Sequence, residues 1–407
     1  MMTKTPPRKD SYIPVRPGDL FKALAGAEGL GGAEASFHEA MRLVAAIFHY
    51  EAFAALEKLK DLYFPLDPDR PGEAADSGAL APFEEALTGV LTTANFVETP
   101  FEALGRDARA DALSELKLKT SDAGIRRVRY FSRGATEQKF ARRRLLGLSK
   151  LEVESEVLHD VVLMVAFDTQ PHKRTPQGAV PGAVLLKHFR NVARHELAAL
   201  HPGAKPTMKR SDQVFLGLPA LAGGAPLLLQ LGAAIPVIFT VIAAYLGAKG
   251  AIDNDSVKKA LAAVSGIVAL GGFMMRQWVK YERQSLKYQK KLSDTVYFRN
   301  AANNTGVLYA LVAAAEEQDV KEAALAYHAL LKHGAMDKAA LDASCEAFLR
   351  EQMNFAVDFE IHDALGKLQR LNLVSQEGDK FIAAPPEEAL KRLDTAWDNI
   401  FQYAAKG

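Results

Sequence analysis

The residues with the clearest chemical potential lie in one acidic stretch of the C-terminal half. Glu316, Glu317 or Glu322 could act as a general acid or base, with Tyr327 as a second proton-transfer group. A solvated helix face held by salt bridges explains the same carboxylates without any chemistry. We favour this second interpretation and assign no catalytic role to these residues.

Other combinations of reactive side chains are incomplete. His188, His195 and His201 are too widely spaced for a metal-binding motif. His159 and Asp160 adjoin an expected strand but have no matching nucleophile or metal-ligand set. The sequence also has no glycine-rich phosphate loop. We therefore predict no catalytic, cofactor-binding or metal-binding residue and expect a protein that is not an enzyme.

Composition limits the class of protein. A chain of 407 residues has room for two or three domains, and its net charge of +1 gives no reason to expect a nucleic-acid partner. A single cysteine excludes a disulfide framework. These features are typical of globular domains that face a reducing compartment.

Hydrophobic periodicity predicts an α+β protein that is mostly helical. The N-terminal helical region covers residues 1–112, with helices over 34–62, 81–94 and 98–111. Residues 113–212 alternate in polarity and predict a small antiparallel sheet, with strands over 116–119, 128–132, 151–157 and 161–167, followed by a helix over 183–200. Residues 276–342 form an amphipathic helical region, and residues 343–407 a separate C-terminal module.

Two uncharged runs, 213–248 and 260–275, interrupt this pattern. They predict a transmembrane hairpin over 213–275, with spans at about 227–248 and 258–276, because roughly 20 apolar residues cross a bilayer. Buried helices of a large soluble core are the alternative, but the runs lack a polar stripe. Flanking basic residues place both termini in the cytoplasm. We expect a bacterial inner-membrane protein, or a mitochondrial inner-membrane protein in a eukaryote.

The C-terminal module has its own organisation. Apolar residues over 357–368 predict a helix, and Glu377-Gly378-Asp379 predicts the turn of a following β-hairpin. This arrangement resembles a winged-helix module. Because nearby acidic residues offset Lys367 and Arg370, we expect the module to contact protein and not DNA.

Several segments of the chain resemble a known family. They are Tyr288, Leu292, Tyr297 and Phe298, then Asn303-Asn304-Thr305-Gly306-Val307-Leu308, Ala315-Glu316-Glu317-Gln318, Lys321-Glu322-Ala323 and Ala326-Tyr327. The sequence is similar to the membrane proteins of domain of unknown function 3754, which include transmembrane protein 143 of eukaryotes. One departure is Ala193, where that family usually has a proline ahead of the acid matched by Glu196.

The resemblance implies a two-span membrane protein and brings no established activity, cofactor or substrate. It singles out motif residues to which we assign no role: Asn303, Asn304, Gly306, Glu316, Glu317, Glu322 and Tyr327. The expected function is that of a membrane-anchored scaffold or regulator. It would bind a lipid bilayer, with a protein partner at the C-terminal module or a second copy of the chain as further partners. An oligomeric channel or transporter component and a membrane-surface enzyme are the alternatives.

Overall fold

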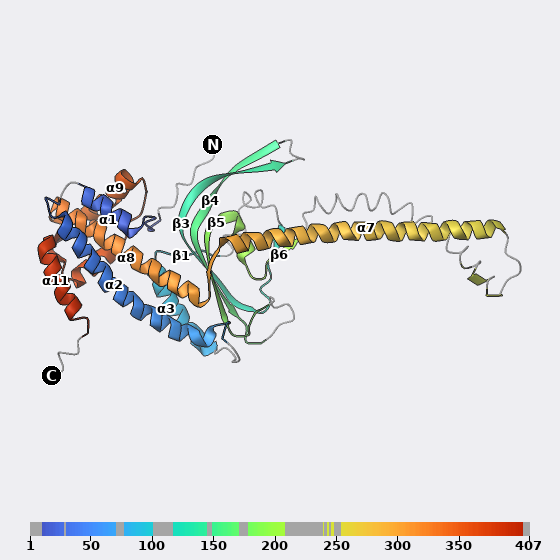
Figure 1. Ribbon diagram of the computed structural model, residues 1–407, viewed down its shortest axis with the longest axis horizontal. Helices are drawn as coiled ribbons and strands as arrows, with labels where there is room; N and C mark the ends of the chain where they lie inside the picture. The colour runs from blue at the N-terminus through green and yellow to red at the C-terminus, as the bar shows by residue number, and fades with distance from the viewer. Residues whose placement is uncertain are drawn as a thin grey trace. The chain divides into compact units, whose positions relative to one another are not determined.

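Figure 1 presents the computed structural model of the chain. It describes residues 10–27, 30–70, 77–100, 117–144, 149–170, 178–207, 239, 242–243, 246–247 and 254–401. The chain divides into two compact units, and each is described separately. The first contains Met1–Leu113, Asp122–Leu197 and Arg299–Gly407, and the second contains Ser114–Ser121 and Ala198–Phe298.

The helices of the first unit follow the hydrophobic spacing of the sequence. They are α1 (Pro17–Gly26), α2 (Glu34–Tyr63), α3 (Leu80–Thr93), α8 (Thr305–His333), α9 (Lys338–Met353), α10 (Ile361–Arg370) and α11 (Pro386–Asp398). The helices predicted over 34–62 and 81–94 are confirmed as α2 and α3. The helix expected over 98–111 lies largely outside the described residues. Figure 1 shows α2 and α8 side by side, and they pack along each other.

A five-stranded antiparallel sheet completes the first unit. Its order is β1 (Val97–Glu98), β3 (Ile125–Arg144), β4 (Ser149–Phe167), β5 (Val184–Ala193) and β7 (Asn300–Asn303). An antiparallel sheet is therefore confirmed, and the predicted strands within it are longer than expected. The strand expected over 116–119 is not part of this sheet and forms β2 (Lys117–Lys119) of a separate two-stranded sheet. The two strands expected over 151–157 and 161–167 form the single strand β4. The register places Arg133 of β3 directly opposite Asp160 of β4, so both side chains point to the same face.

The prediction of a helix over 183–200 is wrong. Residues 184–193 form β5, and a 3-10 helix, Arg194–Leu200, follows. Leu185, Phe189 and Val192 recur every three or four residues, which imitates the spacing of a helix. Asn191 has a φ of 53°, and this irregular backbone interrupts the simple alternation that would have identified a strand.

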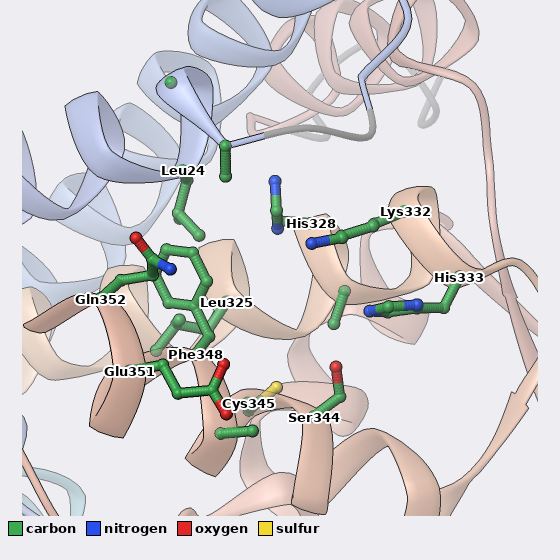
Figure 2. A pocket seen from close by; sticks show the side chains of 14 residues that line it. Leu24, Leu325, His328, Lys332, His333, Ser344, Cys345, Phe348, Glu351 and Gln352 are labelled. Carbon is green, nitrogen blue, oxygen red and sulfur yellow. The ribbon is translucent and has the colours of Figure 1, made fainter.

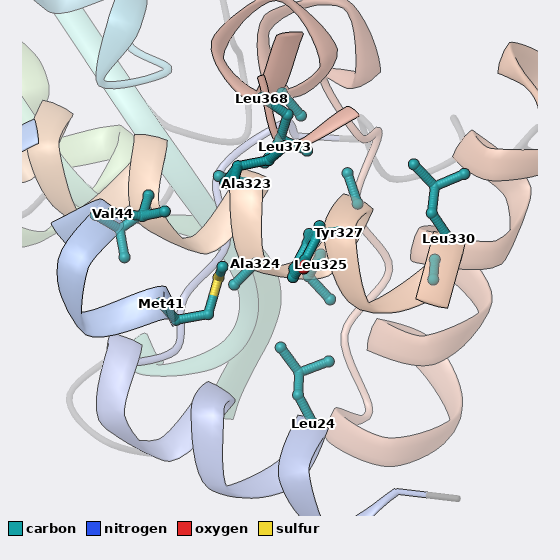
Figure 3. Close-up of a cluster of buried hydrophobic side chains, with 14 of the residues drawn as sticks. Leu24, Met41, Val44, Ala323, Ala324, Leu325, Tyr327, Leu330, Leu368 and Leu373 are labelled. Atoms are coloured by element: carbon teal, nitrogen blue, oxygen red, sulfur yellow. The ribbon is translucent and has the colours of Figure 1, made fainter. Parts of the chain in front are cut away.

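Two hydrophobic clusters stabilise the first unit. In the first, shown in part in Figure 3, α1 and the N-terminal half of α2 pack against the C-terminal half of α8 and against α9, α10 and α11. In the second, the C-terminal half of α2, α3 and the N-terminal half of α8 cover one face of β3, β4 and β5. Because α2 and α8 contribute to both clusters, the middle of α8 lies at the junction between them.

The C-terminal part of the first unit contains the predicted helix and β-hairpin. Helix α10 is followed by β9 (Val374–Glu377) and β10 (Lys380–Ala383), which pair in an antiparallel hairpin. The turn residue Gly378 has a φ of 66°, a conformation that glycine adopts without steric cost. A third strand, β8 (Met336–Asp337), pairs with β10.

The second unit contains a two-stranded sheet and one long helix. Strand β2 (Lys117–Lys119) pairs antiparallel with β6 (Lys205–Thr207). A Cβ atom added at Gly203 would lie 2.0 Å from the backbone oxygen of Ser121, so only glycine fits there. Helix α7 extends over Asn254–Arg299, and all but its last residue belongs to this unit.

The predicted transmembrane hairpin is wrong. Within the residues that the structure describes, no helix combines the length and the apolar character needed to cross a bilayer. The uncharged part of α7 has only the 16 residues Ala260–Met275, or about 24 Å of helix against a hydrocarbon core of about 30 Å. The same helix then continues through Arg276, Lys280 and Arg283. The expected inner-membrane localisation, with both termini in the cytoplasm, is overturned by the same finding. Most of the first uncharged run lies outside the described residues.

A buried polar cluster as candidate functional site

The middle of α8 holds an extended segment from the start of the chain. Gln318 donates a hydrogen bond from Nε2 to the Ser11 carbonyl (3.2 Å) and accepts one at Oε1 from the Ile13 amide (3.4 Å). Lys321 donates from Nζ to the Ile13 carbonyl (2.8 Å). Backbone groups that are buried outside regular secondary structure need hydrogen-bond partners. The side chains of α8 therefore supply the hydrogen bonds that a neighbouring strand would otherwise supply.

Glu322 lies beside this segment and is only 1% exposed. Its Oε1 accepts hydrogen bonds from Gln318 Nε2 and Asn95 Nδ2, each at 3.0 Å, and Asn95 also donates to the Ser11 carbonyl at 2.9 Å. Burial raises the pKa of Glu322 to about 7, although the nearby Lys367 ammonium opposes the shift. The carboxyl group therefore changes its charge near neutral pH.

The sheet contributes a buried ion pair to the same junction. Asp160 Oδ2 accepts from Arg133 Nε at 2.9 Å, and Asp160 Oδ1 lies 2.9 Å from His188 Nε2. The Arg133 guanidinium is flanked by the rings of Tyr12 (4.3 Å) and Phe96 (4.7 Å). Burial opposes ionisation of Asp160, but the hydrogen bond from His188 and the charge of Arg133 outweigh it and lower its pKa to about 2.

Three carboxylates of α8 and α10 surround one ammonium group. Lys367 Nζ contacts Asp319, lies 3.3 Å from Asp363 Oδ2 and 3.9 Å from Glu322 Oε2. Burial raises the pKa of Asp319 to about 6 despite this cation. Oxygens of the three acids come within 4.8 Å of one another, as in a metal site. Lys367 already occupies the space between them, so the arrangement is an internal ion cluster and not a metal centre.

The motif residues 303–306 build the turn from β7 into α8. Asn304 adopts φ 47° and ψ −125°, accepts from the Leu186 amide at 3.2 Å and donates to Asp69 Oδ2 at 2.6 Å. Exposed Asn303 accepts from Lys187 Nζ at 3.2 Å. A Cβ atom at Gly306 would meet only Ala302, at an ordinary 3.8 Å. Asn304 is therefore the residue of this motif on which the turn depends.

We expect Asn304→Ala to lower the free energy of unfolding by about 2–4 kcal/mol. The substitution forces alanine into a positive-φ conformation and removes one buried and one partly buried hydrogen bond. Asn303→Ala, the matched control, should change it by less than about 0.5 kcal/mol, because that side chain is exposed. Urea unfolding of both variants provides the measurement. Equal effects of the two substitutions would contradict this assignment.

The remaining motif residues have separate partners. Exposed Glu317 lies on α8 one residue after Glu316, which contacts His49 Nδ1 at 3.0 Å. Tyr327 is buried and donates from its hydroxyl to the Ala384 carbonyl at 2.7 Å. The structure thus gives Tyr327 a packing role and does not pair it with a carboxylate. The expectation of a solvated acidic face is wrong for Glu322, which is buried.

A cavity of about 420 Å³ adjoins the cluster. Asn95 and Arg133 line it, but their donors already bind Ser11, Glu322, Asp160 and the Ala94 carbonyl. Four carboxylates also line it: Asp10, Glu156, Asp358 and Glu360. Among the described lining residues there is no cysteine or histidine to form a nucleophile–base pair with its serine and threonine hydroxyls. The donors of Asn95 and Arg133 that reach this cavity are therefore used within the fold.

Residues 158–306 match a family described as Protein of unknown function (DUF3754). The match begins within β4 and ends at Gly306, the second residue of α8, so it includes Asp160, His188 and Asn304 but not Gln318 or Glu322. It covers less than half of the chain. No curated protein and no solved structure matches the chain.

Proposed function

We propose that this protein is a regulatory or scaffold protein that binds a protein partner through its winged-helix-like C-terminal module. One observation carries the proposal: the lysine and the arginine of α10 are both bound to carboxylates of the same chain. In winged-helix modules that read DNA, the corresponding helix must present its cations to phosphates and bases.

The two cations of α10 are used in different ways. Lys367 is enclosed by the carboxylates of Asp319, Glu322 and Asp363. Arg370 holds Glu51 of α2 with both terminal nitrogens, one of them at 2.9 Å. A DNA backbone would have to displace these intramolecular pairs. The exposed hairpin turn adds two acids, Glu377 and Asp379, against the single cation Lys380, which further disfavours phosphate.

An exposed aromatic surface supports a protein partner. Its exposed members are Phe53 on α2, Trp397 on α11 and Phe401 just beyond α11, and the half-buried Tyr50 of α2 lies against Phe401. The exposed fractions of Phe53, Trp397 and Phe401 are 57%, 44% and 57%. The rings of Tyr50 and Phe401 meet edge to face at 5.2 Å. Exposed aromatic residues are the side chains most enriched at protein interfaces. We expect a partner that inserts apolar side chains here.

Light crosslinking followed by quantitative mass spectrometry tests the proposal. The double variant Trp397→Ser/Phe401→Ser should recover its stoichiometric protein partner at least about tenfold less well than the wild type, because aromatic anchors carry much of the binding energy. Phe64→Ser is the matched control: its side chain is 62% exposed but lies outside this surface. Unchanged recovery with the double variant would contradict the assigned surface.

A second measurement separates protein from DNA. The wild type should bind duplex DNA no more tightly than the nonspecific range of about 10⁻⁴ to 10⁻⁶ M at physiological salt. Sequence-selective binding of DNA that weakens in Arg370→Ala would overturn the protein-contact proposal. Recovery of only a second copy of the chain would mean that the partner is the protein itself and that it forms a homo-oligomer.

A further inference from the structure

Helix α7 carries a row of exposed residues that we call the α7 seam. Its large apolar side chains have exposed fractions between 50% and 69%: Leu261, Val264, Val268, Met275 and Trp278. Gly271, which is also exposed, completes the row, so successive members are separated alternately by three and four residues. On a helix with about 3.6 residues per turn, this spacing places them in one stripe.

The α7 seam has the pattern that another helix recognises. Alternation of three and four residues is the heptad pattern in which side chains of one helix fit between those of a second helix. A continuous exposed apolar surface commonly marks an interaction site. A helix that lies on a lipid surface would carry charged side chains alongside its apolar stripe, but residues 260–275 contain none. A helix therefore fits the α7 seam better than a lipid surface does.

The sizes of the side chains favour a second copy of α7 that runs in the opposite direction. When Val268 of one copy lies opposite Gly271 of the other, Trp278 lies opposite Leu261. Each small residue then faces a larger one, which is how closely packed layers are filled. In a parallel pair, Gly271 would face Gly271 and leave a gap, and Trp278 would face Trp278 and be crowded. The α7 seam is therefore complementary to itself in the antiparallel direction.

The charges that follow the α7 seam favour the same direction. Residues 276–291 contain six basic side chains and one acidic side chain: Arg276, Lys280, Glu282, Arg283, Lys287, Lys290 and Lys291. A parallel pair would place each basic side chain beside its own copy, where like charges repel. In the antiparallel register, residue 285 lies opposite Asn254, the first residue of α7. The two basic segments therefore do not face each other.

We propose that α7 forms an antiparallel pair with α7 of a second copy of the chain through the α7 seam. This pair is independent of the protein partner proposed above, because the aromatic surface around Trp397 and Phe401 shares no residue with the α7 seam. The double variant Trp397→Ser/Phe401→Ser should therefore self-associate like the wild type. Loss of self-association in this variant would contradict the assignment.

Sedimentation equilibrium of the full chain measures the self-association. The wild type should form a dimer with a dissociation constant of about 100 μM or below. Val268→Asp should raise this constant at least about tenfold, because each copy would bury an unpaired carboxylate in the α7 seam. Ala269→Asp is the matched control and should change it less than about twofold, because Ala269 is exposed on the same helix but outside the α7 seam. A monomeric wild type, or equal effects of the two substitutions, would overturn the proposal.

Disulfide formation tests the direction of the pair. Cys345→Ala removes the only cysteine of the chain, which is 1% exposed and lies in the wall of a cavity of the first unit (Figure 2). Val264→Cys and Met275→Cys are then introduced into separate proteins. In the proposed pair these two positions face each other. Each lies about 16 Å along the helix from the same position in the second copy, which is too far for a disulfide.

A disulfide-linked dimer should therefore form when the two single-cysteine proteins are mixed and allowed to exchange, and not from either protein alone. Dimers from each protein alone would show a parallel pair, and absence of dimers from the mixture would show that the α7 seam does not pair. Either result would refute the proposal.

Flotation with vesicles of phosphatidylcholine and phosphatidylglycerol tests the other occupant. Because the α7 seam is assigned to a second copy, Val268→Asp should bind vesicles no less than the wild type. A wild type that stays monomeric but binds vesicles more strongly than Val268→Asp does would assign the α7 seam to lipid and overturn the pair.

Discussion

Replacing Asp160 with alanine is expected to lower the free energy of unfolding of the first unit by about 3–5 kcal/mol at pH 7. The substitution leaves the buried Arg133 guanidinium without its counter-ion and His188 without its hydrogen-bond partner. Stacking on Tyr12 and Phe96 cannot replace a carboxylate, because a ring carries no net charge. Urea unfolding monitored by circular dichroism provides the measurement.

A matched substitution lies six residues earlier on the same strand. Glu154 faces Lys139 at 3.8 Å across the strand pair, and both side chains are mostly exposed. Glu154→Ala should therefore change the free energy of unfolding by less than about 1 kcal/mol. If Asp160→Ala costs no more than Glu154→Ala, the buried ion pair does not stabilise the junction.

The contribution of Asp160 also has a defined pH range. Its pKa is lowered from 3.8 to about 2 in the folded state, so the folded protein binds fewer protons than the unfolded chain between these values. The stabilisation is present above about pH 4 and is lost as the pH falls through about 2. The wild type should lose stability across this interval more steeply than Asp160→Ala.

The second large effect is at Glu322, and its pH dependence is opposite to that at Asp160. The wild-type free energy of unfolding should decrease by about 3 kcal/mol between about pH 4.5 and pH 7, and we expect Glu322→Gln to lack this decrease. Burial raises the pKa of Glu322 from 4.5 to about 7, so the folded state holds a proton that the unfolded chain releases. Stability therefore falls as the pH rises through this interval. Glutamine keeps an oxygen that can accept from Asn95 and Gln318 but carries no charge.

Urea midpoints at pH 5, 6, 7 and 8 measure this dependence. Asp319, whose pKa is raised to about 6 by burial, should leave a residual slope in Glu322→Gln. Glu317→Gln is the control, because it removes an exposed carboxylate from the same helix and should preserve the wild-type profile. A profile that is unaltered in Glu322→Gln would mean that this carboxyl group is ionised in the fold at every pH tested.

Local patterns predicted much of the helical structure and the final hairpin. The spacing of Phe37, Met41 and Val44 fits only an amphipathic helix, and the Glu377-Gly378-Asp379 turn fixes the hairpin register. The sequence does not distinguish strand β5 from a helix, because its apolar residues fit both periods. The transmembrane prediction for the uncharged part of α7 is wrong, because a run of apolar residues carries no information about the charged helix that continues beyond it.

The candidate site was largely hidden from sequence reasoning. Asp160 binds Arg133 and His188, which are distant in sequence, and no local pattern predicts such a pairing. One signal was available on α8. Leu311, Ala315 and Leu325 belong to a buried stripe at intervals of three and four residues, and Gln318 and Glu322 occupy the same stripe. Polar residues in a buried stripe indicate partners in the core.

The hydrogen bonds from α8 to the start of the chain can form only late in biosynthesis. Gln318 and Lys321 bind backbone atoms of Ile13 that precede them by 305 and 308 residues. At about 5–20 residues per second, a ribosome needs roughly 15–60 s to reach α8 after Ile13 has been added. Throughout that interval the extended segment has no α8 to bind, and α2 lacks its main helical neighbour. The N-terminal segment can therefore dock on α8 only after most of the chain has been made, and until then the apolar face of α2 that packs on α8 lacks its partner.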